Sequence, residues 1–282
     1  MPEEASQLMQ WIEWALYGSG SVVLAALAVV RMRRRDVFLP RLGALAASVE
    51  FFLCLMLSWV AAFLLSSALY PVLAAGVDAK SKLGGMWATA CGTLGLPLGL
   101  LAGLGVFWLV TEPGRADHGM SPRRLGLPAL AGLSVVLFLA TQPVLTAAST
   151  LYGWLDPRGG TQEVVNTVRD GLHGGEGFVP ASIVAAAAIF LAPLAEELVF
   201  RAGLHRLFRN WMGPVGAALA GGVAFGLVHM APAQFLPLAA LGFMLSLAYE
   251  YSGDLRLPIL AHALFNASTV AALYFIPDVT KS

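Results

Sequence analysis

The sequence has 282 residues, of which 58% are hydrophobic and only 12% are charged, and its mean hydropathy is +0.74. Because soluble domains carry about 25% charged residues, this composition excludes a soluble or disordered chain. The 17 basic and 17 acidic residues cancel, so no basic field indicates a nucleic-acid partner. We therefore expect an all-α protein, a polytopic bundle of membrane helices whose immediate partner is the lipid bilayer.

Eight apolar stretches follow one another along the chain. A helix needs about 20 largely apolar residues to cross a hydrocarbon core of about 30 Å. These stretches predict about eight transmembrane helices: Leu16–Val30, Leu42–Tyr70, Leu83–Val110, Leu127–Thr150, Val179–Phe200, Gly213–Met230, Pro232–Tyr249 and Leu255–Ile276.

The basic residues support this count. With eight spans, twelve of the seventeen lysines and arginines fall in the segments on one side, 31–41, 111–126, 201–212 and 250–256. Cytoplasmic segments are enriched in basic residues, so the pattern predicts that both termini lie outside. We read His205, Arg206 and Arg209 as part of an inside flank of this kind.

The chain is expected to have three parts. Residues 1–150 form an N-terminal four-span region, 151–178 an extracytoplasmic loop, and 179–282 a four-span core. In the loop, four apolar residues at helical spacing predict either a short interfacial helix or one side of a solvated loop. They are Val164, Val165, Val168 and Leu172.

Polar residues cluster within the last spans. The fifth span ends in Glu196, Glu197 and, four residues later, Arg201, while the sixth ends in Phe225-Gly-Leu-Val-His229. The eighth contains His262 and Asn266. Since an ionisable group in hydrocarbon costs a few kcal/mol, each is a candidate functional residue.

Helical spacing divides these residues into roles. Glu197 and Arg201 are four apart with the acid first, so in an α-helix they share one face and can pair. Glu196 projects about 100° away and is available to another partner. His262 and Asn266 likewise share a face.

A register argument brings the motifs together. Glycine and proline at Gly213-Pro214 predict a turn between the fifth and sixth spans, which makes them an antiparallel hairpin. Residues opposite one another in such a hairpin have numbers with a constant sum. Glu196 and His229 sum to 425, which centres the hairpin on that turn.

The residues themselves leave two chemistries open. Glu196 can act as general base on a water molecule, with a histidine that orients this water or shuttles its proton and with His262 and Asn266 donating hydrogen bonds to an oxyanion. Alternatively, Glu196, His229 and His262 can hold zinc as a His₂Glu set with one open position.

Other polar residues have plainer explanations. Glu50 in the second span is expected to meet a polar partner such as Gln142 or an aqueous cavity. His118 and His173 lie in loops and carry no functional signal. Cys54 and Cys91 occupy separate apolar stretches and are interpreted as buried hydrophobic residues.

In order and spacing, the three motifs resemble those of the CPBP intramembrane protease family. This family, also called ABI, includes the type II CAAX prenyl endopeptidases and bacteriocin-processing or self-immunity proteins. The resemblance covers roughly residues 178–276. It implies peptide-bond hydrolysis inside the membrane, at a cavity reached from the cytoplasmic side.

By motif position, the resemblance implies that Glu196 activates water with help from His229, and that His262 and Asn266 stabilise the oxyanion. Glu197 and Arg201 then shape the site. The family has been described both as metalloproteases and as metal-independent glutamate proteases; the neutral Asn266 favours the metal-free route, so zinc is the alternative cofactor.

The expected substrate is a membrane-associated or lipidated peptide or protein. Fourteen arginines against three lysines indicate a GC-rich bacterial genome and hence a bacterial inner membrane. A non-enzymatic immunity or scaffold protein that uses the same polar cluster for helix packing is the alternative function. A proton-relaying transporter is disfavoured because no interrupted segment is repeated in two halves.

Overall fold

The computed structural model describes residues 2–34, 39–45, 48–111, 125–155 and 163–275, and in these residues it contains helices and no strands. The all-α prediction is therefore confirmed. Along the chain the elements are α1 (Pro2–Arg33), α2 (Ser48–Leu73), α3 (Lys82–Val110), α4 (Leu127–Leu155), α5 (Glu163–Gly171), α6 (Phe178–Ala186), η2 (Ala187–Leu191), α7 (Ala192–Glu197), η3 (Leu198–His205), α8 (Arg206–Phe208), α9 (Pro214–Val228), η4 (Pro232–Gln234), α10 (Phe235–Ser252) and α11 (Arg256–Phe275).

Seven helices in the described residues are long and apolar enough to cross a membrane. Each corresponds to one of the predicted spans, and the protein is an integral, multi-pass membrane protein. The sixth predicted span corresponds to α9, which has only 15 residues. At 1.5 Å per residue, α9 is about 22 Å long and shorter than the hydrocarbon core.

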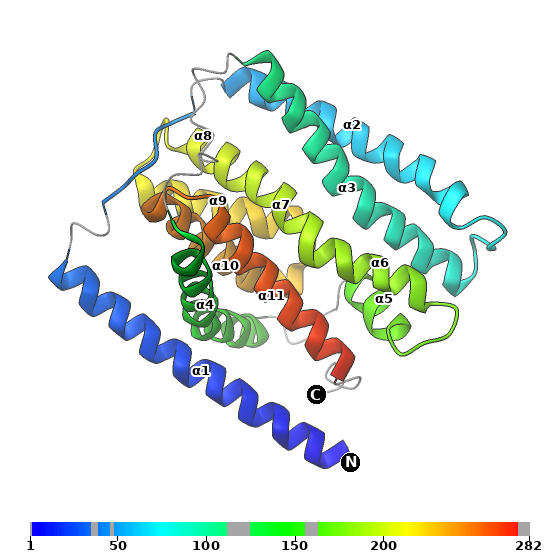
Figure 1. The fold of residues 1–282 in the computed structure, drawn as a ribbon, viewed down its shortest axis with the longest axis horizontal. Helices are drawn as coiled ribbons and strands as arrows, with labels where there is room; N and C mark the ends of the chain where they lie inside the picture. Colours follow the sequence, from blue (N-terminus) through cyan, green and yellow to red (C-terminus); the bar gives the residue numbers. More distant parts are fainter. Residues whose placement is uncertain (1, 35–38, 46–47, 112–124, 156–162, 276–282) are drawn as a thin grey trace. The chain divides into compact units, whose positions relative to one another are not determined.

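The chain forms two compact units that interleave along the sequence. The first unit comprises Met1–Ala44, His118–Gly160 and Phe200–Leu264. Within it, α4 packs against α1 and α10, and α9 packs closely along α10 (Figure 1). This unit contains Arg201 and both motif histidines.

The second unit comprises Leu45–Asp117, Thr161–Val199 and Phe265–Ser282. Its α2 and α3 form an antiparallel pair (Figure 1), and α3 also packs against α5, α6, η2 and α7. Small residues let α2 and α3 approach closely, as is common in membranes. These are Ser58, Ala62 and Ser66 on α2 and Gly95, Gly99 and Gly103 on α3.

The polar segment after α4 contains the predicted short helix, α5. Its apolar face packs on protein rather than at the membrane interface, because Val168 is buried in a cluster with Ala90 of α3, Val184 of α6 and Leu273 of α11. The other three predicted residues, Val164, Val165 and Leu172, pack on the same cluster.

A salt bridge to the start of α3 fixes α5 further, and a second ion pair lies within α5 itself. Asp170 accepts an ion pair from Lys82 at 3.0 Å and another from Arg169 at 3.0 Å. The hydrogen bond from Lys82 is the main reason why the pKa of Asp170 lies below its ordinary value. His173 connects this region to α11, since its Nε2 lies 2.9 Å from the carbonyl oxygen of Tyr274 and its ring stacks on the Tyr274 ring.

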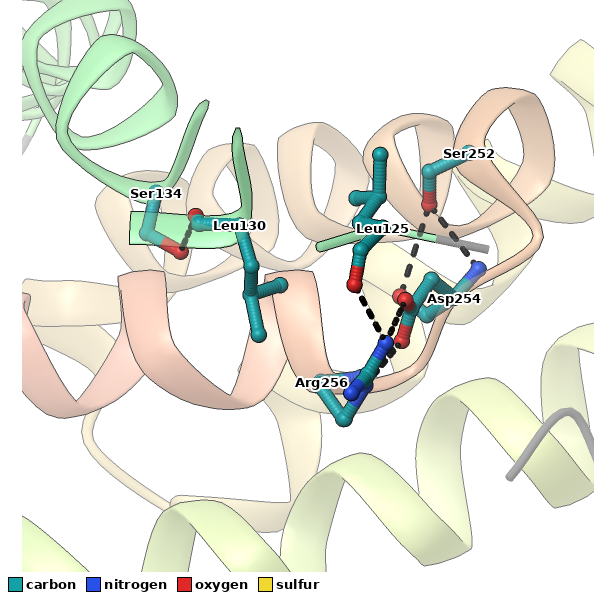
Figure 2. Close-up of polar contacts among 6 residues, drawn as sticks. All are labelled: Leu125, Leu130, Ser134, Ser252, Asp254 and Arg256. Atoms are coloured by element: carbon teal, nitrogen blue, oxygen red, sulfur yellow. Dashed lines mark hydrogen bonds and ion pairs between the residues drawn. The ribbon is translucent and has the colours of Figure 1, made fainter. Parts of the chain in front are cut away.

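The turn between α10 and α11 is held by Asp254 (Figure 2). Its carboxylate accepts the backbone N–H of Arg256 at 3.1 Å and the Arg256 guanidinium at 2.6 and 2.9 Å. The same guanidinium donates to the Leu125 carbonyl at 3.0 Å. Burial raises the pKa of Asp254, but the hydrogen bonds from Arg256 outweigh it, so that this pKa lies below its ordinary value. The first turn of α11, the helix of His262, is fixed in this way.

Candidate functional site

The helix that carries the first motif is not a regular α-helix. This helix, which we call the motif-one helix, is continuous from Phe178 to Phe208. It is π-helical at Ala187–Leu191 and again at Leu198–His205. In a π-helix the hydrogen bonds follow an i→i+5 pattern, and such turns are rare and frequent at functional sites. The expectation that regular α-helical spacing holds from Glu197 to Arg201 is therefore wrong, because Arg201 lies inside the wider turn.

Arg201 is fully buried in the first unit. Its Nη2 donates to the carbonyl oxygen of Gly242 on α10 at 3.2 Å. The guanidinium carbon lies 4.8 Å from the centroid of the Phe225 ring, within the range of a cation–π interaction. A buried guanidinium is thus held by a backbone dipole on one side and an aromatic face on the other.

Phe225 is the residue around which the first unit arranges the motif side chains. It is fully buried. Its ring centroid lies 4.7 Å from the imidazole of His229 and 5.7 Å from that of His262. Because Arg201 sits on the same ring, one aromatic side chain contacts functional candidates from all three motifs.

His229 is half-buried and held in one tautomer. Its Nδ1 lies 2.7 Å from the carbonyl oxygen of Phe225, one turn earlier in α9. A carbonyl only accepts hydrogen bonds, so Nδ1 must carry the proton. In the neutral imidazole the lone pair is then on Nε2, which can accept a proton from water or bind a metal ion.

Asn266 belongs to the second unit and contacts the helix of the first motif there. Its Nδ2 donates to the carbonyl oxygen of Ala188 at 2.7 Å. Ala188 lies in the π-turn η2, where the backbone hydrogen-bond pattern changes and a side-chain donor satisfies a carbonyl. Since a side-chain amide has two N–H donors, a second hydrogen bond is still available for chemistry.

The two carboxylates differ in burial. Glu197, at the end of α7, is fully buried, whereas Glu196 is half-buried. Both belong to the second unit, while Arg201, His229 and His262 belong to the first. The structure thus brings the arginine and the two histidines together within one unit and Asn266 against the motif-one helix within the other.

The predicted hairpin is confirmed. The motif-one helix ends at Phe208, Gly213 precedes α9, and α9 begins at Pro214. Phe200 and Phe225, whose numbers sum to 425, meet with ring centroids 5.1 Å apart. This is the sum on which the predicted hairpin is centred.

Two residues that we assigned to an inside flank are instead buried. His205 is 0% exposed and Arg206 is 8% exposed, because the helix continues to Phe208 and does not end near Phe200. Arg206 donates to the Gly43 carbonyl at 3.1 Å. His205 meets Glu250, a residue that we placed in an inside loop but that lies within α10.

Three further expectations can be compared with the structure. Glu50 is exposed, and Gln142 donates to the Phe138 carbonyl of its own helix. Cys54 and Cys91 are buried free cysteines, as predicted. His118 lies outside the described residues.

Histidine and carboxylate side chains supply the donors that a zinc site needs. The predicted set is Glu196, His229 and His262, and Nε2 of His229 has a lone pair for it. Among the residues that the structure describes, no group of three histidine, cysteine or carboxylate residues able to hold a metal ion is found.

The three motifs therefore lie in this order on helices of a multi-pass helical bundle. Residues 178–268, about a third of the chain, match the family model of the type II CAAX prenyl endopeptidases, Rce1-like. The match confirms the resemblance drawn from the motifs: over these residues the chain is similar to a family of membrane proteases. Comparisons with curated proteins and with solved structures give no match.

Proposed function

We propose that the protein is an intramembrane endopeptidase that hydrolyses a peptide bond of a membrane-associated or lipidated peptide. The observation that supports this most directly is the Phe225 ring, which contacts Arg201, His229 and His262. Buried ionisable groups are expensive in a membrane, and packing alone gives no reason to gather three of them on one ring.

In the proposed reaction, Glu196 is the general base. It takes a proton from a water molecule whose oxygen attacks the carbonyl carbon of the scissile bond. The Nε2 lone pair of His229 accepts the second hydrogen bond of that water, because Nδ1 is committed to the Phe225 carbonyl. The proton then passes from Glu196 to the leaving amine as the carbon–nitrogen bond breaks.

The negative charge that develops on the carbonyl oxygen needs donors in place before the reaction. We assign this role to His262 and Asn266. Asn266 is already oriented by its hydrogen bond to Ala188, and its second N–H is the donor. His262 is buried against Phe225, so its ring has little freedom to move.

Glu197 and Arg201 shape the site rather than react. Arg201 is fixed by Gly242 and Phe225, and both residues are fully buried. The proposed substrate is a membrane-associated or lipidated peptide or protein, and a prenylated CAAX peptide serves as the probe because the family description names that class of enzyme. The membrane is proposed to be a bacterial inner membrane, with the site open to the cytoplasmic side.

Zinc is the alternative to the general base. When bound, zinc would supply a Lewis acid and a more acidic water. The same three residues, Glu196, His229 and His262, would hold it. Metal analysis of purified wild type and His229→Ala distinguishes the routes: a stoichiometric metal that is lost in the variant supports zinc, and metal-free protein with full activity supports the general base.

The substitution Glu196→Gln tests the function itself. New protein termini are mapped in membranes of cells that express wild type or Glu196→Gln at matched levels, and purified proteins are assayed with a fluorogenic farnesylated CAAX peptide. We expect cleavage to fall at least ~10²-fold while the fold is retained.

The exposed Glu176, which lies outside the motifs, provides the matched control Glu176→Gln. It is expected to cleave at the wild-type rate. Full turnover by Glu196→Gln would refute the assignment. A silent Glu196→Gln together with unfolding of Arg201→Ala would favour the non-enzymatic packing role.

A further inference from the structure

A buried polar seam runs between the motif-one helix and α10. It begins at Arg201 of the first motif and continues past the three motifs. Basic side chains recur at every fourth position, at Arg201, His205 and Arg209. Each meets α10: Arg201 donates to the Gly242 carbonyl at 3.2 Å, and His205 Nε2 lies 2.6 Å from Glu250 Oε2. Arg209 Nε lies 3.3 Å from the same oxygen. We call these five residues the polar seam.

The centre of the seam is unusually well buried for charged chemistry. The side chains of His205 and Glu250 are both 0% exposed. A carboxylate accepts hydrogen bonds, so His205 Nε2 is the donor in this contact. Two basic residues therefore converge on one carboxylate oxygen inside the protein.

A chain segment outside the seam covers its end. The backbone N–H of Arg41 donates to the Glu250 carbonyl at 3.0 Å, and Gly43 accepts from Arg206. Arg206 follows His205 directly and is also buried. It therefore offers a neighbouring buried basic residue as a control, one whose guanidinium donates to the Gly43 carbonyl.

Stability alone is a poor reason for such a pair, because an apolar pair of similar volume is often at least as stable in a buried position. The best-attested use of buried polar contacts is to specify register. The motif-one helix and α10 run in parallel here, and the basic positions that contact α10 repeat every four residues along the motif-one helix. Apolar faces with that repeat permit a slip of one turn, whereas a single carboxylate marks one register.

That register matters at the first residue of the seam. Arg201 lies within the π-turn η3, whose last residue is His205. A π-turn persists when its surroundings hold it. A slip or relaxation at His205 would move the Arg201 guanidinium away from the Gly242 carbonyl and from the Phe225 ring, which also contacts His229 and His262.

We infer that His205 and Glu250 are positioning residues of the peptidase site, which fix η3 on α10 and thereby hold Arg201 in place. This inference rests on the proposed function. It assigns neither residue a contact with substrate; both act through Arg201.

The test compares three variants with wild type: Glu250→Leu, the double variant His205→Leu with Glu250→Leu, and the control Arg206→Gln. The single variant leaves a histidine and an arginine without their carboxylate, so it can lose stability. The double variant replaces the pair with apolar groups and is expected to keep the wild-type Tm within a few degrees. Rates are measured with the farnesylated CAAX peptide, per folded molecule.

We expect the double variant to lose kcat by about tenfold or more with KM unchanged, since a small misplacement in a site is costly. Arg206→Gln should keep the wild-type kcat and KM. A purely structural pair would instead change Tm and leave kcat per folded molecule unaltered.

Wild-type kcat in the double variant would overturn the inference, as would a change confined to KM. Unfolding of the double variant would overturn it too, because the pair would then hold the whole fold. The Glu196→Gln variant is assayed alongside. If it cleaves at the wild-type rate, the proposed function fails, whereas loss of cleavage there with full kcat in the double variant refutes the positioning role alone.

Discussion

The crossing of α9 and α10 allows a sharp prediction, because its spacing depends on glycine. A Cβ atom built at Gly222 would lie 2.6 Å from the Ala239 carbonyl oxygen and 2.8 Å from the Phe243 nitrogen. Both are backbone atoms that cannot rotate away. The first contact is about 0.8 Å short of the 3.4 Å at which ordinary contact begins, so Gly222→Ala must push the helices apart by several tenths of an ångström.

Two effects of Gly222→Ala follow. Overpacking of this kind costs about 1–3 kcal/mol of stability. Phe225 lies one turn further along α9, and Gly242, opposite Gly222, carries the carbonyl that receives Arg201. A displacement approaching 1 Å at a catalytic site can cost about 10²-fold in rate, so we expect kcat to fall between about tenfold and a hundredfold.

Thermal unfolding in detergent and cleavage of the farnesylated peptide measure the two effects. Gly216→Ala in the same helix is the matched control, since a Cβ atom there would meet only the flexible Met212 side chain, at 3.3 Å and beyond. It should keep wild-type activity and gain slightly in helix propensity. Equal behaviour of the two variants would refute the idea that the close crossing at Gly222 sets the site.

Two further predictions concern regions outside the site. Val168→Cys should react slowly with a membrane-impermeant thiol reagent and Glu176→Cys quickly, because Val168 is 2% exposed and Glu176 is exposed. The native cysteines are buried and should add little background. Equal labelling would contradict the packing of α5 on protein. Asp254→Asn should lower Tm at neutral pH. The pKa of Asp254 is lowered in the folded protein, so the ionised carboxylate stabilises the fold fully above its unfolded pKa of about 3.9, and this stabilisation is lost as the pH falls through the folded pKa. The Tm difference between wild type and Asp254→Asn should therefore vanish at acid pH. A pH-independent difference would argue against the ion pair with Arg256.

Hydropathy was sufficient to predict the helices because the membrane leaves few alternatives. With no water to satisfy the backbone, an apolar stretch of about 20 residues must form a helix. The turn at Gly213-Pro214 was predictable on different grounds, because proline favours the first turn of a helix. The amphipathic pattern of α5 was also visible, but the sequence could not say whether its valines faced lipid or protein.

The π-turns could not be predicted, and they account for the main errors around the site. Nothing in the composition of Leu198–His205 distinguishes a π-turn from an α-helix. The helix also continues to Phe208, and His205, which the charge pattern assigned to a flank, is buried in it. The spacing of Arg201, His205 and Arg209 was a usable signal: three basic residues at every fourth position on a span end, with Glu250 near the end of another.

The structure also gives a physical reason for an aromatic residue four positions before the motif histidine. The Phe225 carbonyl fixes the tautomer of His229, which leaves Nε2 free for chemistry. Its ring provides a negative face for the Arg201 guanidinium and packs against both histidines. A leucine at this position could supply the carbonyl and the bulk but not the quadrupole, so Arg201 would lose its cation–π contact with this ring. The motif is therefore a single structural device, in which the backbone of Phe225 orients the base partner and the side chain holds the buried cation.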